Sequence, residues 1–144
     1  MADQGFELHR ISEAEADVIR NRWIETYVPA NFQRHERSLP HWFYWHTFSF
    51  ESVRHEQDDV ARTCFEKSKA SLKYIWFARS SLGLYECKTV PDAISNNLTG
   101  EIREIHGELA DSVWTGDQFA WTYTATHEEE WGLGPYFSMK KWMK

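Results

Sequence analysis

The 144-residue sequence predicts an α+β fold in a single domain: an antiparallel sheet of about four to six strands with helices packed on one face. Two observations lead to this prediction. Apolar residues recur at helical spacing in two stretches, and aromatic or β-branched residues alternate with other residues in several more. The alternating stretches follow one another through short, turn-rich connections, which are typical of hairpins and therefore of antiparallel pairing.

The first helix is predicted over residues 13–27, after a lead-in over residues 1–11 that contains a candidate edge strand. Its start is a capping box. The hydroxyl of Ser12 can accept a hydrogen bond from the amide of Glu15, and the Glu15 carboxylate can accept one from Ser12 in return. Pro29 ends the helix, since the residue before a proline disfavours helical backbone angles.

A second helix is predicted to begin at Asp58 or Asp59, after a polar connector over residues 51–56. It ends near residues 67–69, where lysines suit the negative end of the helix dipole. Between the two helices, residues 44–50 are dense in aromatic rings and alternate as a strand does.

Two hairpins are predicted in the rest of the chain. The first joins strands over 72–78 and 83–89, and the second leads from 112–115 into a strand that starts at Phe119. In that last strand the apolar side chains share one side, which predicts a half-buried strand. These side chains are Phe119, Trp121, Tyr123 and Ala125.

Composition excludes several classes of function. The net charge is −6 and the cations form no stripe, which argues against nucleic acid as a partner. No apolar run approaches the roughly 20 residues that span a bilayer, and no signal peptide begins the chain, so we expect a cytoplasmic protein. Cys64 and Cys87 lack zinc-ligand spacing and are predicted to be reduced thiols on core faces. We therefore predict no metal and no cofactor. The lysines of residues 139–144 predict a basic tail at the end of the domain.

His46 and His127 are the candidates for a pocket. With Glu128 they could form a general acid–base pair or a partial metal site if their two strands are neighbours. The alternative is that both imidazoles bond to backbone or tyrosine groups and hold one end of the sheet. No catalytic motif accompanies them, so no catalytic residue is assigned.

Acidic residues are the candidates for contact with a partner protein. The run Glu128, Glu129 and Glu130, with Trp131 after it, forms either a solvated face or an acidic patch for a basic partner. Asp117 is close in sequence and is predicted to extend the patch, together with acidic residues of the preceding stretch, namely Glu104, Glu108 and Asp111.

Three pieces of the sequence carry a resemblance to a known family, and one of them is the amphipathic stretch 59–65 followed by residues 74–77. Residues 45–50 read Trp-His-Thr-Phe-Ser-Phe, and a C-terminal stretch reads Trp-Thr-Tyr-Thr-Ala-Thr-His-Glu followed by Gly-Pro-Tyr-Phe. The chain resembles a family of small bacterial proteins of unknown function marked by these segments, over roughly residues 16–138. It departs from the family in the inserted residues 129–131 and in the basic tail.

The resemblance implies a function by association, because small acidic proteins of this sort are often encoded beside bacterial toxins and act as immunity proteins. We therefore expect a cytoplasmic immunity protein that occludes the active site of a basic cognate toxin, such as a nuclease. The alternative is a small enzyme or ligand-binding domain with its pocket near His46 and His127. A third possibility is a self-associating structural protein. The oligomeric state is left open.

Overall fold

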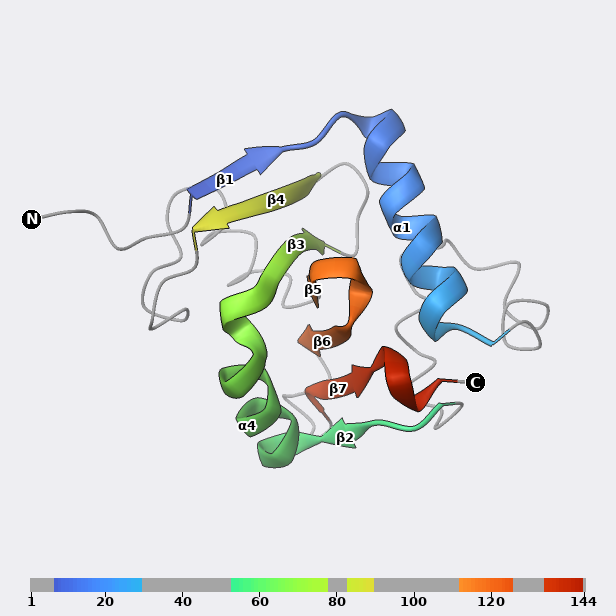
Figure 1. Cartoon of the computed structure of the whole chain (residues 1–144), viewed down its shortest axis with the longest axis vertical. Coiled ribbons are helices and arrows are strands. Elements are labelled where there is room, and N and C mark those ends of the chain that lie inside the picture. Colours follow the sequence, from blue (N-terminus) through green and yellow to red (C-terminus); the bar gives the residue numbers. More distant parts are fainter. Residues whose placement is uncertain (1–6, 30–52, 78–82, 90–111, 126–133, 144) are drawn as a thin grey trace, which may run out of the picture.

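A computed structural model describes residues 7–29, 53–77, 83–89, 112–125 and 134–143 (Figure 1). These residues form two α-helices, seven β-strands and three short 3₁₀ turns. The helices are α1 (Glu13–Tyr27) and α4 (Asp58–Ser68). The strands are β1 (Glu7–Arg10), β2 (Glu56–Gln57), β3 (Leu72–Phe77), β4 (Leu84–Thr89), β5 (Ser112–Gly116), β6 (Trp121–Ala125) and β7 (Tyr136–Met139). The 3₁₀ turns are η2 (Lys69–Ser71), η4 (Asp117–Phe119) and η6 (Lys140–Trp142).

The strands form one antiparallel sheet in the order β1-β4-β3-β5-β6-β7-β2. The predicted α+β class is confirmed, and so are the β3–β4 and β5–β6 hairpins. Seven strands exceed the predicted four to six. One reason is β2, whose two residues pair with Phe137 and Tyr136 of β7 although the sequence indicated a polar connector there. The predicted strand over 44–50 lies outside the described residues.

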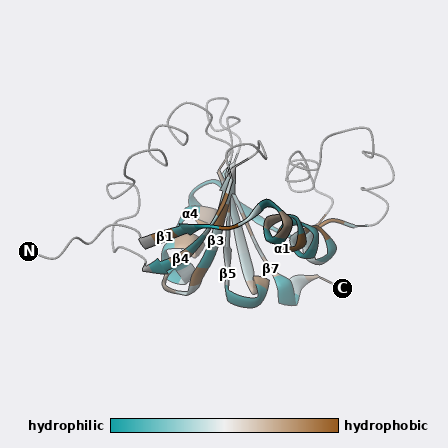
Figure 2. Ribbon diagram, turned by 90° about the horizontal axis from the view of Figure 1, so that it is seen from above, coloured by the Kyte–Doolittle hydropathy of each residue, from teal (hydrophilic) through white to brown (hydrophobic). Residues whose placement is uncertain are grey.

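The helices lie on opposite faces of the sheet, so the prediction that they share one face is wrong. Figure 1 shows α4 on one side of β3, β5 and β6 and α1 on the other, and Figure 2 shows the same arrangement from above. One core cluster gathers around Phe65 of α4 and contains Ile75. The other gathers around Trp23 of α1 and contains Trp76. Adjacent residues of β3 thus point to different cores, because side chains alternate along a strand.

Strand β6 is consequently buried on both faces and not half-buried. Trp121 and Tyr123 face α4, where the ring of Phe65 stacks on Tyr123 with centroids 4.3 Å apart. Thr122 and Thr124 face the α1 side and are both 0% exposed. The small polar side chain of threonine also fits beneath a helix, at least cost when its hydroxyl is bonded.

Helix α1 is held to this strand by a buried hydrogen bond. Trp23 Nε1 donates to Thr122 Oγ1 over 2.9 Å, and the same hydroxyl donates to the carbonyl of Trp114 over 3.1 Å. The hydroxyl of Thr124 has no hydrogen-bond partner among the described residues. Thr122 and Thr124 therefore lie on the same face of β6, but only the Thr122 hydroxyl forms hydrogen bonds within the described residues.

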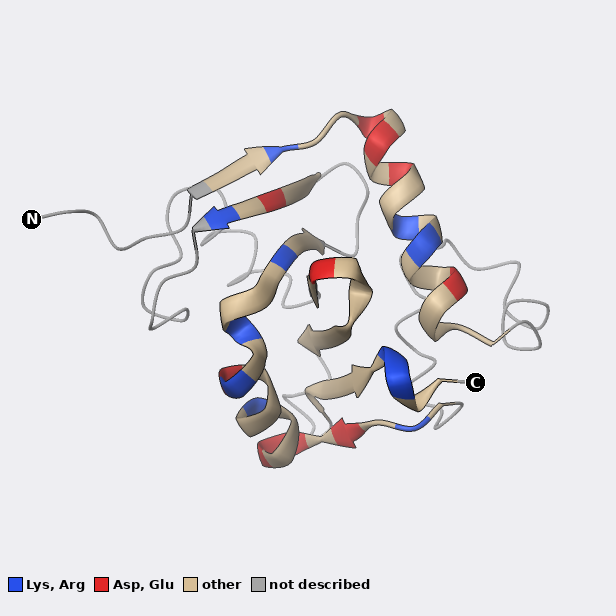
Figure 3. Ribbon diagram, in the orientation of Figure 1, with Lys and Arg blue, Asp and Glu red and all other residues tan. Residues whose placement is uncertain are grey.

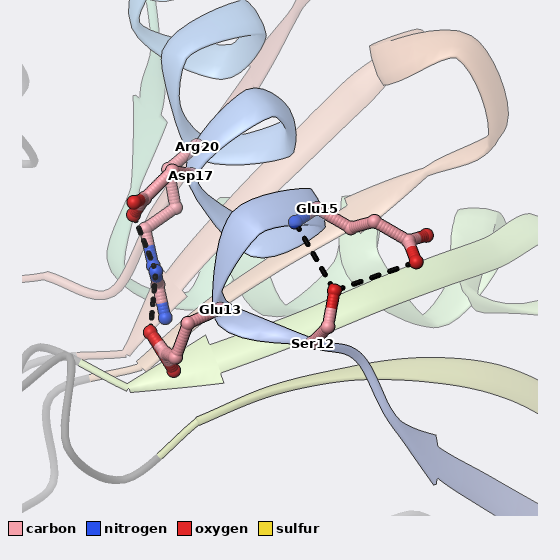
Figure 4. A network of polar contacts seen from close by, with 5 residues as sticks. All are labelled: Ser12, Glu13, Glu15, Asp17 and Arg20. Atoms are coloured by element: carbon pink, nitrogen blue, oxygen red, sulfur yellow. Dashed lines mark hydrogen bonds and ion pairs between the residues drawn. The ribbon is translucent and has the colours of Figure 1, made fainter.

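The start of α1 is the predicted capping box (Figure 4). It differs from an ordinary capping box because the Glu15 carboxylate bonds to the hydroxyl of Ser12 and not to its backbone amide. Ser12 Oγ accepts from the amide of Glu15 over 3.3 Å, and the Glu15 carboxylate accepts from the Ser12 hydroxyl over 3.4 Å. One turn further on, the buried guanidinium of Arg20 lies 3.4 Å from Asp17 and 3.8 Å from Glu13. The predicted bounds of this helix and its end before Pro29 are confirmed.

Replacing the two threonines by valine tests whether the Trp23 bond holds the layers together. Thr122→Val should lower the free energy of unfolding by about 1–3 kcal/mol, because it removes the hydroxyl that accepts a hydrogen bond from the buried Trp23 indole N–H. Thr124→Val should leave stability unchanged or raise it slightly, since no bond within the described residues is lost. Urea denaturation measures both, and equal losses for the two variants would contradict this account.

Candidate binding surface

The connection between β5 and β6 is a tight turn with an unusual backbone. Gln118 has φ 55° and ψ 24°, and Phe119 has φ 58°. Both lie in the left-handed region, which costs roughly 1–2 kcal/mol for each residue that carries a Cβ atom. Phe119 is therefore not the first residue of the strand, as the alternation predicted. The strand begins at Trp121, and the Phe119 ring packs on the α1 face.

Contacts from two distant parts of the chain hold this turn in place. The hydroxyl of Tyr27 donates to the carbonyl of Phe119 over 2.7 Å, and Lys140 Nζ donates to the carbonyl of Gln118 over 3.1 Å. Burial raises the pKa of Tyr27 far above its usual value, so this hydroxyl stays protonated as a donor. Such contacts keep a strained backbone in one conformation.

The residue before the turn must be glycine. A Cβ atom at Gly116 would lie 2.2 Å from Nε1 of Trp121. That indole nitrogen is itself fixed, because it donates to Ser71 Oγ over 2.8 Å. The close approach of Trp121 therefore sets where β5 ends and where the turn starts.

The turn presents a mixed surface, which we call the turn surface and define as Tyr74, Asp117, Gln118 and Phe119. Asp117 and Gln118 are exposed, while the other two residues are half-buried. The rings of Tyr74 and Phe119 stack with centroids 6.1 Å apart. Asp117 is the one predicted contact residue that the structure describes, and its carboxylate makes no ion pair within the described residues.

Charged groups beside the turn surface are already paired. Lys73 Nζ lies 2.7 Å from one oxygen of Glu86, and Lys88 Nζ lies 3.3 Å from the other. The hydrogen bond from Lys73 lowers the pKa of Glu86, and the same bond raises the pKa of Lys73. Burial raises the pKa of Tyr74. All three pKa values move away from neutrality, whereas a general acid or base works best with a pKa near the working pH.

The register brings a row of titratable residues together that sequence reasoning missed. Tyr74 lies opposite Glu86, and Glu86 lies opposite His9 of the edge strand β1. Directly opposed residues share a face of an antiparallel sheet, so all three lie on the α1 face. Glu86 stands between Tyr85 and Cys87, which belong to the core on the α4 side. That alternation was a signal that Glu86 points the other way.

The other predicted site residues are His46, His127, Glu128, Glu129, Glu130 and Trp131, and they lie outside the described residues. The described chain nevertheless shows where their segment is attached. The segment 126–133 follows Ala125, which lies at the opposite end of β6 from Asp117. Asp117 is therefore separated by the length of β6, about 17 Å at 3.4 Å per residue, from the point where the glutamate segment begins.

A second acidic segment is attached at the same place. Ser112 and Ala125 are directly paired, so the segment 90–111 ends beside the point where 126–133 starts. These two segments contain eight acidic residues and one cation, Arg103. The described ranges contain eleven acidic and eleven cationic residues out of 22 and 16 in the whole chain. Figure 3 shows both kinds spread over the helices and strands. The described part is thus neutral, and the net charge of −6 comes entirely from the remaining segments.

The described residues contain no group of three or more potential metal ligands. Within the same ranges, no helix has the length and apolar character needed to cross a membrane. Both cysteines are free thiols, and both contribute to the core on the α4 side, as predicted.

The fold and this surface define a small α+β domain, built on an open antiparallel sheet with one helix on each face. The chain belongs to the family described as a domain of unknown function, DUF4275, whose family model matches residues 15–137. The expected membership of a family of unknown function is confirmed. No curated protein and no solved structure matches the chain.

Two truncations of Gln118 test whether the turn is strained. Gln118→Gly should be more stable than Gln118→Ala by about 1 kcal/mol, because glycine adopts left-handed angles without the Cβ clash. Both variants remove the same side-chain atoms beyond Cβ, so their difference isolates the backbone. Equal urea midpoints would show that the turn stores no strain.

The buried Cys87 thiol should be unreactive in the native protein. Burial raises its pKa to about 12, so only about one molecule in ten thousand carries the thiolate at pH 8. In a Cys64→Ser variant, a thiol reagent should label Cys87 only as fast as the protein opens or unfolds. Complete labelling within seconds under native conditions would contradict this expectation and identify a reactive thiol.

Proposed function

We propose that this protein is a binding protein that neutralises a basic partner protein, acting as a cytoplasmic immunity protein that occludes the active site of a cognate bacterial toxin. One observation carries the proposal. The described helices and strands carry no net charge, and the sheet is packed on both of its faces. At the Ser112–Ala125 pair, this sheet places the ends of two strongly acidic segments side by side. Binding residues are commonly carried by connecting segments on a rigid scaffold.

Electrostatics supports a basic partner. The segments 90–111 and 126–133 carry a net charge of −7, from eight acidic residues and Arg103. A surface of one sign speeds the encounter with a partner of the opposite sign and disfavours other partners. A nuclease fits this description because its substrate-binding face has to be cationic. Covering that face would exclude the nucleic acid and stop the reaction.

The scaffold supports binding by occlusion. Its aromatic side chains lie on both faces of the sheet, with the ring of Phe65 within 6 Å of Trp114, Trp121 and Tyr123. A rigid binder loses little conformational freedom on association, so more of the contact energy appears as affinity. Trp131 adds an aromatic anchor beside the three glutamates in the sequence.

Charge reversal in the glutamate run tests the proposal directly. The double change Glu129→Lys/Glu130→Lys should weaken binding at least tenfold to the protein encoded by the adjacent gene, measured by calorimetry at moderate salt. The reason is that two favourable contacts become repulsive. The same variant should lose protection of cells that express that protein.

Two single variants serve as controls. Glu66→Lys reverses a charge on the exposed side of α4, and Glu25→Lys reverses one on the exposed side of α1. Each should change the affinity less than the double variant does, because neither touches the segments 90–111 and 126–133. No complex with the wild-type protein would overturn the proposed function, and equal losses in all three variants would show only a general dependence on net charge.

A further inference from the structure

We propose that one edge of the sheet binds a second copy of this chain and forms an antiparallel dimer with two-fold symmetry. The edge consists of β2 with the start of α4 and of β7 with the η6 turn that follows it, residues 54–60 and 136–142, and we call it the β2–β7 edge. Such a dimer needs no other protein, so it does not depend on the proposed function. The distribution of charged and apolar side chains along the edge supports it.

The first turn of α4 makes one end of the β2–β7 edge acidic. It contains Asp58 and Asp59, and Glu56 of β2 precedes it. The amide of Asp58 donates to the carbonyl of Pro135 over 2.9 Å, so this turn lies beside the start of β7. Val60 belongs to the same turn, and its side chain is 54% exposed. This end therefore combines three carboxylates with an exposed apolar side chain.

The η6 turn makes the other end of the β2–β7 edge cationic. Lys140 and Lys141 lie in this turn, directly after the last residue of β7, and both are exposed. Arg54 is also exposed, and its guanidinium lies 4.3 Å from the ring centroid of Trp142. In Figure 3 the start of α4 is red and the η6 turn after β7 is blue. The three cations form no ion pair within the described residues, so their charges are available to a neighbouring molecule.

A two-fold axis through the middle of this edge brings unlike charges together. Strand β7 separates the two ends and has four residues, which span about 14 Å at 3.4 Å each. The separation is the same in both copies, so an antiparallel arrangement matches both contacts at once and closes the dimer. A parallel arrangement would place like charges opposite each other, which is unfavourable.

Charged residues and short strands also protect sheet edges from association, and the arrangement of the charges decides between the two roles. Three acidic and three cationic residues sum to zero here and are segregated, so a second copy meets attraction and no net repulsion. Asp59 already pairs with Arg62, but an exposed pair contributes little, and its exchange for the partner copy's lysines costs little. Val60 then lies over the end that holds the half-buried Trp142 and Met143.

Sedimentation equilibrium of the full chain tests the proposal. The dissociation constant of the dimer should rise at least about tenfold between about 0.01 M salt, where the Debye length is about 30 Å, and about 0.15 M, where it is about 8 Å. Asp59→Lys and Lys141→Glu should each weaken the dimer at least about tenfold at low salt, because two-fold symmetry makes each change reverse two contacts. Both side chains are exposed, so neither change disturbs the core.

An equimolar mixture of the two variants should restore association. Asp59→Lys makes both ends of the edge more basic and Lys141→Glu makes both more acidic, so only the mixed dimer opposes unlike charges at both contacts. Glu25→Lys and Arg22→Glu carry the same changes in net charge on the exposed side of α1, and each should dimerise as the wild-type protein does.

Three outcomes would overturn the dimer. The first is a wild-type protein that stays monomeric at low salt and high concentration. The second is a mixture that remains as monomeric as its two components, which excludes antiparallel pairing of this edge. The third is an equal loss in the α1 controls, which would show a dependence on net charge alone. None of these outcomes changes the affinity expected for a basic partner, so the proposed function is tested separately.

Discussion

Burial of both faces of the central strands is the constraint on which the rest of the structure depends. A strand between two helices has no water on either side, so its polar side chains must find partners inside the protein. Indole N–H groups supply two of them, since Trp23 bonds to Thr122 and Trp114 bonds to Ser112. A third indole, that of Trp121, bonds to Ser71 of η2, so the tryptophans of the described core fill volume and also satisfy or anchor polar groups.

Packing and excess charge are two separate roles that are divided between different parts of the chain. The described helices and strands balance their charges and bury their rings, whereas the excess of acidic residues is confined to the segments between them. The β5–β6 hairpin links these roles. One end fixes where two acidic segments begin and finish, and the other end is a turn fixed by Tyr27 and Lys140.

Local signals in the sequence were sufficient for the elements that depend on neighbouring residues. The capping box and Pro29 gave the bounds of α1, and the turn-rich connections gave both hairpins. What failed depends on distant contacts. Alternation in β6 could not show that α1 covers its threonine side, because Trp23 is almost a hundred residues away. The two-residue strand β2 exists only because β7 lies beside it. Phe119 followed the alternation of the strand, yet Tyr27 and Tyr74 hold it in the turn.

The pairing of Ser112 with Ala125 has a consequence for how the protein responds to ionic strength. It joins two like-charged segments at one point, so their mutual repulsion acts on the folded state and adds nothing to its stability. Salt screens this repulsion over a Debye length of about 10 Å at 0.1 M. The same screening weakens attraction to a cationic partner. Under the proposed function, added salt would therefore relieve the repulsion within the fold and weaken association with the partner.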